Sequence, residues 1–133
     1  MTESKAVLEV RPKELLVPVD FSACSRHAFE YATAWAARID AKIDVLHVFP
    51  LPLVTYPASG LKRLELQHRA LRVACSEANV DLLEFLRGTP TPETGNVHTI
   101  LRWGDPQIEI VAQAAYESYD LVVMGTHYSP PRR

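Results

Sequence analysis

Asp20 is the first residue in the chain whose type and position could do chemistry. It follows a short apolar run, Leu15 to Val19, within the stretch KELLVPVDFSACS. Short continuous apolar runs are typical of parallel strands that are covered on both faces, so we expect a buried strand at about 14–19. Open α/β sheets place their ligands just beyond the carboxyl ends of such strands. Asp20 is therefore a candidate ligand contact, and the alternative is a carboxylate that caps a helix or a turn.

The other reactive side chains form no recognisable catalytic or metal-binding pattern. His27, His68 and His98 share no ligand spacing with one another or with an acidic pair, so we expect no metal site. Cys24 lies near a helix start, which can activate a thiol, yet an inert and partly buried thiol suits it better. His47 lies inside a strand and is expected to be a packed structural residue. The sequence contains no GxxxxGK[ST], GxGxxG, HExxH or GxSxG motif, so nothing in it supports an enzyme.

Size and composition indicate one globular domain. The 133 residues are 47% hydrophobic and carry a net charge of −2. This length suits a single core, and the near-balanced charge gives no electrostatic case for nucleic acid or a membrane surface. No apolar stretch approaches the roughly 20 residues that span a bilayer, and the polar N-terminus does not resemble a secretory signal. With only two cysteines, we expect reduced thiols and a cytoplasmic location.

Apolar periodicity divides the chain into alternating strands and helices. We expect an N-terminal arm at 1–12, one domain at 13–127 and a C-terminal tail at 128–133. Strands are predicted at about 14–19, 43–49, 97–103 and 121–124, with a helix between each pair. This alternation predicts a parallel sheet with right-handed crossovers. If the strand order is 3-2-1-4, the order reverses between the first and fourth strands, which brings Asp20 and Gly125 to one crevice.

The three helices have recognisable ends and apolar stripes. Ser22 is the expected N-cap of the first helix and Asp40 its end, while Asp105-Pro106 is the strongest helix start in the chain. The expected buried stripes are Ala28, Ala32, Trp35, Ala36 and Ile39 in the first helix, Leu61, Leu64, His68, Leu71, Cys75 and Ala78 in the second, and Ile108, Val111, Ala112 and Ala115 in the third. Arg26 is placed on the solvent side. The pattern leaves open whether the apolar set at 82–86 continues the second helix.

Five segments together resemble the universal stress protein family. They are LLVPVDFS, AFEYATAWAARI, IDVLHVF, RWGDPQIEI and DLVVMGTH, and they cover about 13–127 with the family's spacing. The resemblance implies a three-layer α/β fold with a doubly wound parallel sheet in the order 3-2-1-4, of the adenine-nucleotide alpha hydrolase-like type. It also implies adenine-nucleotide binding, a homodimer and a role in stress response, without an assigned metabolic reaction.

The same resemblance assigns the candidate binding residues. Asp20 matches the family's acidic residue near adenine and ribose, and Val48 matches the position whose backbone reads the base. Met124, Gly125 and His127 match the start of the glycine-rich phosphate segment. A carboxylate can accept hydrogen bonds from ribose hydroxyls or the adenine amino group, although it repels phosphates. A glycine lets backbone N–H groups come close to phosphate oxygens.

The phosphate segment departs from the family pattern. The pattern G-x2-G-x9-G-[ST] needs a second glycine where this sequence has Tyr128, and the later glycine, the fourth helix and the usual fifth strand are missing from the 133 residues. Losing several charge-assisted hydrogen bonds, each worth about 1.5–3 kcal/mol, predicts that ATP or AMP binds weakly. The fourth strand would then be a sheet edge, and we expect either a dimer contact that differs from the family's or shielding of that edge by the polar PPRR tail. The sequence leaves open whether the short C-terminus is natural.

Two functions from different classes are therefore open. One is a stress-response domain that keeps a partial adenine-nucleotide site. The other is a dimerisation or protein-interaction module that binds no nucleotide. Asp20, Val48 and Gly125 favour the first, and the lost glycines favour the second.

Overall fold

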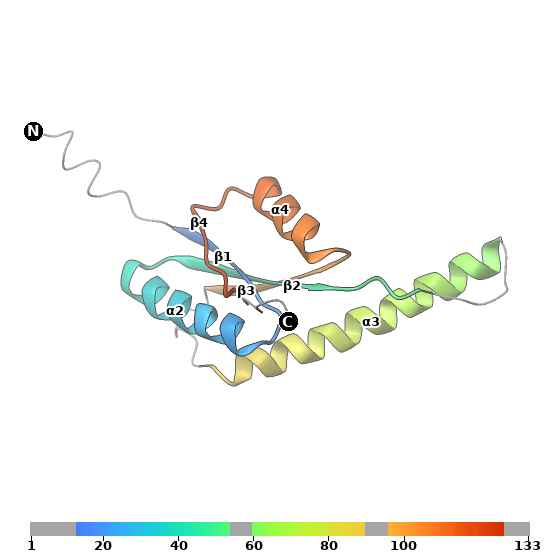
Figure 1. Ribbon diagram of the computed structural model, residues 1–133, viewed down its shortest axis with the longest axis horizontal. Coiled ribbons are helices and arrows are strands. Elements are labelled where there is room, and N and C mark those ends of the chain that lie inside the picture. Colours follow the sequence, from blue (N-terminus) through green and yellow to red (C-terminus); the bar gives the residue numbers. More distant parts are fainter. Residues whose placement is uncertain (1–12, 54–59, 90–95, 127–133) are drawn as a thin grey trace, which may run out of the picture.

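Strands and helices alternate along the whole of the chain that the computed structural model describes, which is residues 13–53, 60–89 and 96–126 (Figure 1). The elements are β1 (Glu14–Pro18), α2 (Ala23–Ile39), β2 (Lys42–Phe49), α3 (Leu61–Arg87), β3 (Val97–Trp103), α4 (Pro106–Tyr116) and β4 (Leu121–Val122). The predicted arm at 1–12 and tail at 128–133 lie outside the described residues, as does His127.

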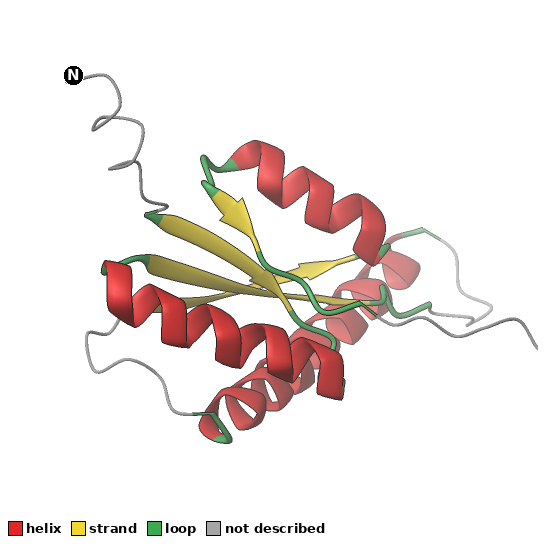
Figure 2. Cartoon of the chain, turned by 60° about the vertical axis from the view of Figure 1, so that its left-hand side comes forward, coloured by secondary structure: helices red, strands yellow, loops and turns green. Residues whose placement is uncertain are grey.

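The four strands form one parallel sheet in the order β3-β2-β1-β4. In the registers, Val17 of β1 lies opposite Val45 of β2, and Leu16 lies opposite Val122 of β4. Helices α2 and α3 cover one face of the sheet and α4 covers the other (Figure 2). The α/β doubly wound fold and the strand order 3-2-1-4 are thus confirmed. The fourth strand is shorter than predicted, because pairing with β1 stops at Val122 and only the backbone N–H of Val123 still donates to the sheet, to the carbonyl of Leu16 at 2.9 Å.

The apolar core lies between the sheet and the pair α2 and α3. Its buried members are Leu15, Val17, Val19, Phe29, Ala32, Ala36, Ala41, Ile43, Val45, Leu82 and Phe85. The predicted stripe of α2 is correct for Ala32 and Ala36, but Ala28 and Trp35 are only half-buried. Phe29, which the prediction omitted, is the largest fully buried side chain among the described residues. Burying a side chain of this size contributes about 1.5–3 kcal/mol.

Arg26 is not on the solvent side as predicted. Its Nη2 donates to the carbonyl of Phe85 at 3.2 Å, and its Nη1 donates to Thr89 Oγ1. The guanidinium lies over the Phe85 ring, with 4.3 Å between Cζ and the ring centroid. A long arginine stem can cover apolar surface while its head reaches polar groups, and here the head reaches one oxygen atom in the last turn of α3 and one just after the helix.

The helix ends agree with the capping signals in the sequence. Ser22 Oγ accepts from the backbone N–H of Ser25 at 3.1 Å, and Asp40 ends α2 in the left-handed conformation with φ of 55°. Asp105 Oδ1 accepts from the backbone N–H of Gln107 at 2.9 Å, with Pro106 as the first residue of α4. These contacts satisfy N–H groups that have no partner inside the helix.

Helix α3 is a single helix from Leu61 to Arg87, so the apolar set at 82–86 does continue it. The predicted face is buried only near its C-terminal end, at Ala78, whereas Leu61 and Leu64 are exposed. The reason is length, because 27 helical residues span about 40 Å at 1.5 Å each. The eight residues of β2 span only about 26 Å. The N-terminal half of α3 therefore extends past the end of the sheet (Figure 1).

The predicted stripe of α4 is wrong. Ile108 and Val111 are 66% and 68% exposed, Ala115 is exposed, and the one buried side chain in the helix is Gln113. Of the predicted set only Ala112 is half-buried. Gln113 is buried against the sheet because β2 and β3 and the turn before β4 carry polar partners for this side of the helix, as described below. Among the described residues, no helix has the length and apolar character to cross a membrane.

Candidate functional site

A cavity of about 430 Å³ opens at the carboxyl ends of β1 and β2. Its lining residues are Pro18, Val19, Asp20, Ser25, Leu46, Val48, Pro106, Gln107, Ile110, Val111, Met124 and Gly125. The structure thus brings four of the five candidate residues to one cavity, namely Asp20, Val48, Met124 and Gly125. His127 lies outside the described residues, and a ligand contact by any of the five stays a prediction.

Asp20 lines this cavity and also shapes the turn that leads into α2. Its Oδ1 accepts a hydrogen bond from the backbone N–H of Ser22 at 3.0 Å, and its own backbone N–H donates to Ser25 Oγ at 3.3 Å. The first contact is that of an Asx turn, in which a carboxylate mimics a backbone carbonyl. Asp20 therefore does stabilise a turn, which was the alternative to a ligand contact in the sequence analysis. The same hydrogen bond holds its side chain at the cavity rim.

Aromatic packing fixes the backbone between Asp20 and α2. Phe21 has a φ of 66°, a left-handed conformation that costs a residue with a Cβ about 1–2 kcal/mol. Its ring stacks on His47 with centroids 4.2 Å apart and meets Phe85 at 5.6 Å. The His47 ring nitrogen Nδ1 lies 2.9 Å from the carbonyl oxygen of Val19. These contacts offset the cost at Phe21 and confirm that His47 is a packed structural residue.

Gly125 is placed against the first turn of α2. A Cβ added to it would lie 2.3 Å from the carbonyl oxygen of Cys24 and 2.8 Å from the backbone nitrogen of Ser25. No side chain fits there without moving backbone, so the residue must be glycine for this close approach. The structure thus gives Gly125 a packing role, whereas its contact with a phosphate stays a prediction. Cys24 is half-buried, as expected.

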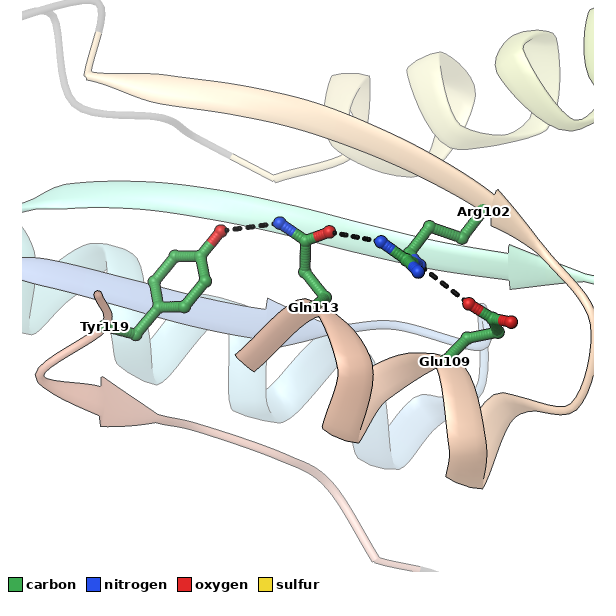
Figure 3. Close-up of polar contacts among 4 residues, drawn as sticks. All are labelled: Arg102, Glu109, Gln113 and Tyr119. Atoms are coloured by element: carbon green, nitrogen blue, oxygen red, sulfur yellow. Dashed lines mark hydrogen bonds and ion pairs between the residues drawn. The ribbon is translucent and has the colours of Figure 1, made fainter. Parts of the chain in front are cut away.

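Helix α4 forms the opposite wall of the cavity, and a chain of polar side chains holds it on the sheet. Arg102 of β3 forms an ion pair with Glu109 of α4, with 2.8 Å between Nε and Oε2. The same guanidinium donates through Nη1 to Gln113 Oε1 at 3.0 Å, and Gln113 Nε2 donates to the hydroxyl of Tyr119 at 3.1 Å (Figure 3). Glu109 and Gln113, one helical turn apart, are therefore tied to side chains outside α4.

Tyr119 joins this polar chain to the middle strand of the sheet. Its hydroxyl donates to Asp44 Oδ2 of β2 at 2.6 Å. Burial of the hydroxyl and its hydrogen bond to Asp44 raise the pKa of Tyr119 to about 12, since both disfavour the phenolate. The five residues Asp44, Tyr119, Gln113, Arg102 and Glu109 are called the polar chain below.

The sequence analysis did not identify the polar chain. Its members come from β2, β3, α4 and the turn before β4, and only Glu109 and Gln113 are one helical turn apart. That spacing was the available signal, because residues four apart share a face of a helix. The apolar residues Ile108 and Val111 indicated more strongly that a different face of α4 is buried, and the prediction was based on them.

The cavity is mostly apolar in character. Within the described lining, Asp20 is the one ionisable side chain, and the base of the cavity is made of aliphatic groups. No three His, Cys, Asp or Glu side chains gather as a metal site anywhere in the described parts of the chain. An apolar cavity with one carboxylate in its lining suits a small ligand that has an apolar body and a few hydrogen-bond donors.

Comparisons with known proteins point to one family. The profile of the universal stress protein family matches residues 12–133. A universal stress protein of Methanocaldococcus jannaschii is 31% identical over 115 residues, which are 86% of this chain and 64% of that protein. The chain therefore spans a little under two thirds of the length of this relative.

Solved structures agree with the profile. Universal stress protein UspA from Lactobacillus plantarum is 29% identical, with a TM-score of 0.61 over 94% of this chain and 85% of that one. A universal stress protein in complex with cAMP is 18% identical, with a TM-score of 0.50 over 86% of this chain and 76% of that one. The second likeness concerns the fold alone.

Proposed function

Because the chain belongs to the universal stress protein family, we propose that it is a stress-response domain whose cavity binds an adenine nucleotide. The observation that carries this proposal is the meeting of Asp20, Val48, Met124 and Gly125 at one cavity. These residues come from the ends of three different strands, at the point where the strand order reverses. Open α/β sheets bind ligands at such points. The cAMP complex of a protein with the same fold is consistent with a ligand of this kind.

The base and the ribose have suitable partners in the cavity. Leu46, Val48, Ile110 and Met124 offer aliphatic surface for the faces of a purine ring. Asp20 can accept hydrogen bonds from ribose hydroxyls, because its position at the rim is fixed by the contact with Ser22. The volume of about 430 Å³ lies in the range of about 300–1,000 Å³ that is usual for small-molecule sites.

The phosphates have fewer partners. Asp20 repels them, and the second glycine of the family pattern is replaced by Tyr128. We therefore propose that adenosine, AMP and ATP bind with similar and weak affinity, since the phosphates add little. We also propose binding without turnover, because Asp20 already serves the Ser22 turn and no second ionisable group stands beside it in the described lining.

Titration calorimetry of adenosine, AMP and ATP tests this proposal. Asp20→Asn should weaken the binding of adenosine by about tenfold or more, because a hydrogen bond to a charged acceptor is worth about 1.5–3 kcal/mol. Asp105→Asn is the matched control, since Asp105 makes the same contact with a backbone N–H two residues on and does not line the cavity.

The outcomes separate the alternatives. The proposal is wrong if adenosine, AMP and ATP all fail to bind the wild-type chain at millimolar concentration, or if both asparagine variants bind alike. Release of phosphate or diphosphate from ATP, lost in Asp20→Asn, would contradict binding without turnover.

One observation favours the second function, an interaction module. The N-terminal half of α3 extends past the sheet and exposes apolar side chains such as Leu61 and Leu64. This observation concerns a part of the molecule away from the cavity, so both functions can belong to one chain.

A further inference from the structure

The outer face of α3, opposite the core, carries a regular apolar row. Leu66, Val73 and Val80 follow one another at seven-residue intervals and so lie on one side of the helix. Val73 and Val80 are 54% and 55% exposed, and Leu66 is half-buried. Leu66 and Val73 line a shallow hollow that Pro52 closes on one side. Among the described residues, Pro52 is the one residue outside α3 that lines this hollow.

Charged side chains on the same stripe are divided by sign. Lys62 and Arg69 lie in the N-terminal half of α3, whereas Glu77 and Glu84 lie in the C-terminal half. They alternate with the apolar row at spacings of three and four residues, which places all of them on one face. All four are exposed, and none forms an ion pair with another residue of the described chain. We call this face, from Lys62 to Glu84, the outer stripe.

The outer stripe is complementary to itself when it is reversed about Val73. Leu66 and Val80 lie seven residues before and after Val73. Arg69 and Glu77 lie four residues before and after it, and Lys62 and Glu84 lie eleven before and after. Apolar residues therefore exchange with apolar residues, and each cation exchanges with a carboxylate. This is the pattern that a twofold symmetric contact requires, because residue i of one copy meets residue j of the other and the reverse holds as well.

We propose that α3 pairs with α3 of a second copy of this chain, antiparallel, across a twofold axis at Val73. Arg69 then faces Glu77 of the second copy, Lys62 faces Glu84, and Leu66 faces Val80. A parallel pair would instead place Arg69 against Arg69 and Glu77 against Glu77. The charge order thus selects the antiparallel arrangement and excludes the parallel one.

The shape of the molecule leaves room for this pairing. The outer stripe is about 33 Å long at 1.5 Å per residue. The N-terminal half of α3 lies beyond the end of the sheet, so a second helix can approach it without meeting the strands (Figure 1). The contact uses no strand edge, and β4, which has one neighbour in the described sheet, does not take part in it.

The interface is small, so the dimer is expected to be weak. Its apolar contacts come from Leu66, Val73 and Val80, and exposed ion pairs each contribute little. We expect a dissociation constant of the order of micromolar or weaker. The association should weaken as salt rises, because exposed charges are screened.

Charge reversal and charge exchange test the pairing in the full chain. Sedimentation equilibrium at low salt measures the dissociation constant of the wild type, Arg69→Glu, Glu77→Arg and the double variant R69E/E77R. Each single variant should raise the constant by about tenfold, because every change occurs twice in a symmetric dimer. The double variant should return the dissociation constant to the wild-type value, because the two charges are exchanged between the paired positions.

The rescue cannot arise within one helix. Arg69 and Glu77 are two turns apart, about 12 Å along the axis, which is too far for a contact inside a single α3. Arg72→Glu is the matched control, since Arg72 is exposed on the same helix but lies off the outer stripe. It should leave the dissociation constant within about twofold of the wild type. Far-ultraviolet circular dichroism checks that every variant keeps its helix content.

The pairing would be overturned by a wild type that stays monomeric over the whole concentration range, by a double variant that does not recover, or by an Arg72→Glu variant as impaired as Arg69→Glu. A dimer that none of the variants changes would also overturn it, because it would place the contact elsewhere. Nucleotide is left out of these measurements, so failure of the cavity proposal would not affect the result.

Discussion

The two faces of the sheet are built in different ways. The face under α2 and α3 is apolar, and Leu15, Val17 and Val45 are fully buried there beneath Phe29. The face under α4 carries the polar chain, in which five side chains from four parts of the molecule are linked end to end. The first face is stabilised by area removed from water, whereas the second combines the buried aliphatic residues Leu16 and Leu46 with paired polar groups.

This difference indicates that stability depends on side-chain volume at the first face and on hydrogen-bond partners at the second. An apolar core loses stability in proportion to the atoms removed and the space left behind. A network of hydrogen-bonded side chains loses much stability when one member is removed, because its former partner is left without a hydrogen bond. Because α4 also forms a wall of the candidate cavity, the polar face is the one that positions the site.

The largest effect is expected on the apolar face. Phe29→Ala should lower the free energy of unfolding by about 3–5 kcal/mol, because the side chain is fully buried and its loss leaves a cavity. Tyr31→Ala, at an exposed position of the same helix, is the control and should change the value by about 0.5 kcal/mol or less. Urea denaturation measures both. A small effect of Phe29→Ala would mean that the apolar face is not the main source of stability.

The same division explains what the sequence could predict. On the apolar face, runs such as LLVPV and the alanines of α2 have a period that identifies strands and a helix, so the elements were predicted correctly. The strand order was also correct, but it came from the family resemblance and not from periodicity. The placement of Asp20 and Gly125 at one crevice followed from the assumed strand order 3-2-1-4, because the order reverses between the first and fourth strands.

The polar face was not predictable in the same way. A hydrophobic period assumes that the buried side of a helix is its apolar side, and α4 violates this because Gln113 is paired on both sides. The pairing of Tyr119 with Asp44 joins residues that are far apart in sequence, and no local pattern indicates it. Arg26 was misplaced on similar grounds, since its partners lie at the end of α3 and just after it, about 60 positions away in the sequence. Helix length, not periodicity, decided how much of α3 is covered.

A smaller effect is expected at the centre of the polar chain. Gln113→Ala should lower the free energy of unfolding by about 1–3 kcal/mol, because it removes a donor to Tyr119 and an acceptor from Arg102. Gln107→Ala is the control, since Gln107 is an exposed glutamine of the same helix. If Gln113→Ala costs as much as Phe29→Ala, the two faces do not differ in the way described here. No loss of stability at all would show that the polar chain is dispensable for folding.

The smallest effect is expected at Tyr119, where it depends on pH. Tyr119→Phe should cost about 1 kcal/mol at neutral pH, through loss of the hydrogen bond to Asp44. The pKa of Tyr119 is raised from 10.0 to about 12 in the folded chain. As pH rises from 10 to 12, the unfolded chain therefore loses this proton first.

The sign of the effect follows from that order of proton loss. The contribution of Tyr119 is fully present below pH 10 and is lost as pH rises toward 12, so the wild type should become less stable over this interval. Tyr119→Phe should lack this part of the decline, and Tyr116→Phe, at an exposed position, should keep it. Urea denaturation at a series of alkaline pH values measures the three profiles. Parallel profiles for all three proteins would show that the Tyr119 hydroxyl is not held by Asp44, and the polar face would then lose its link to β2.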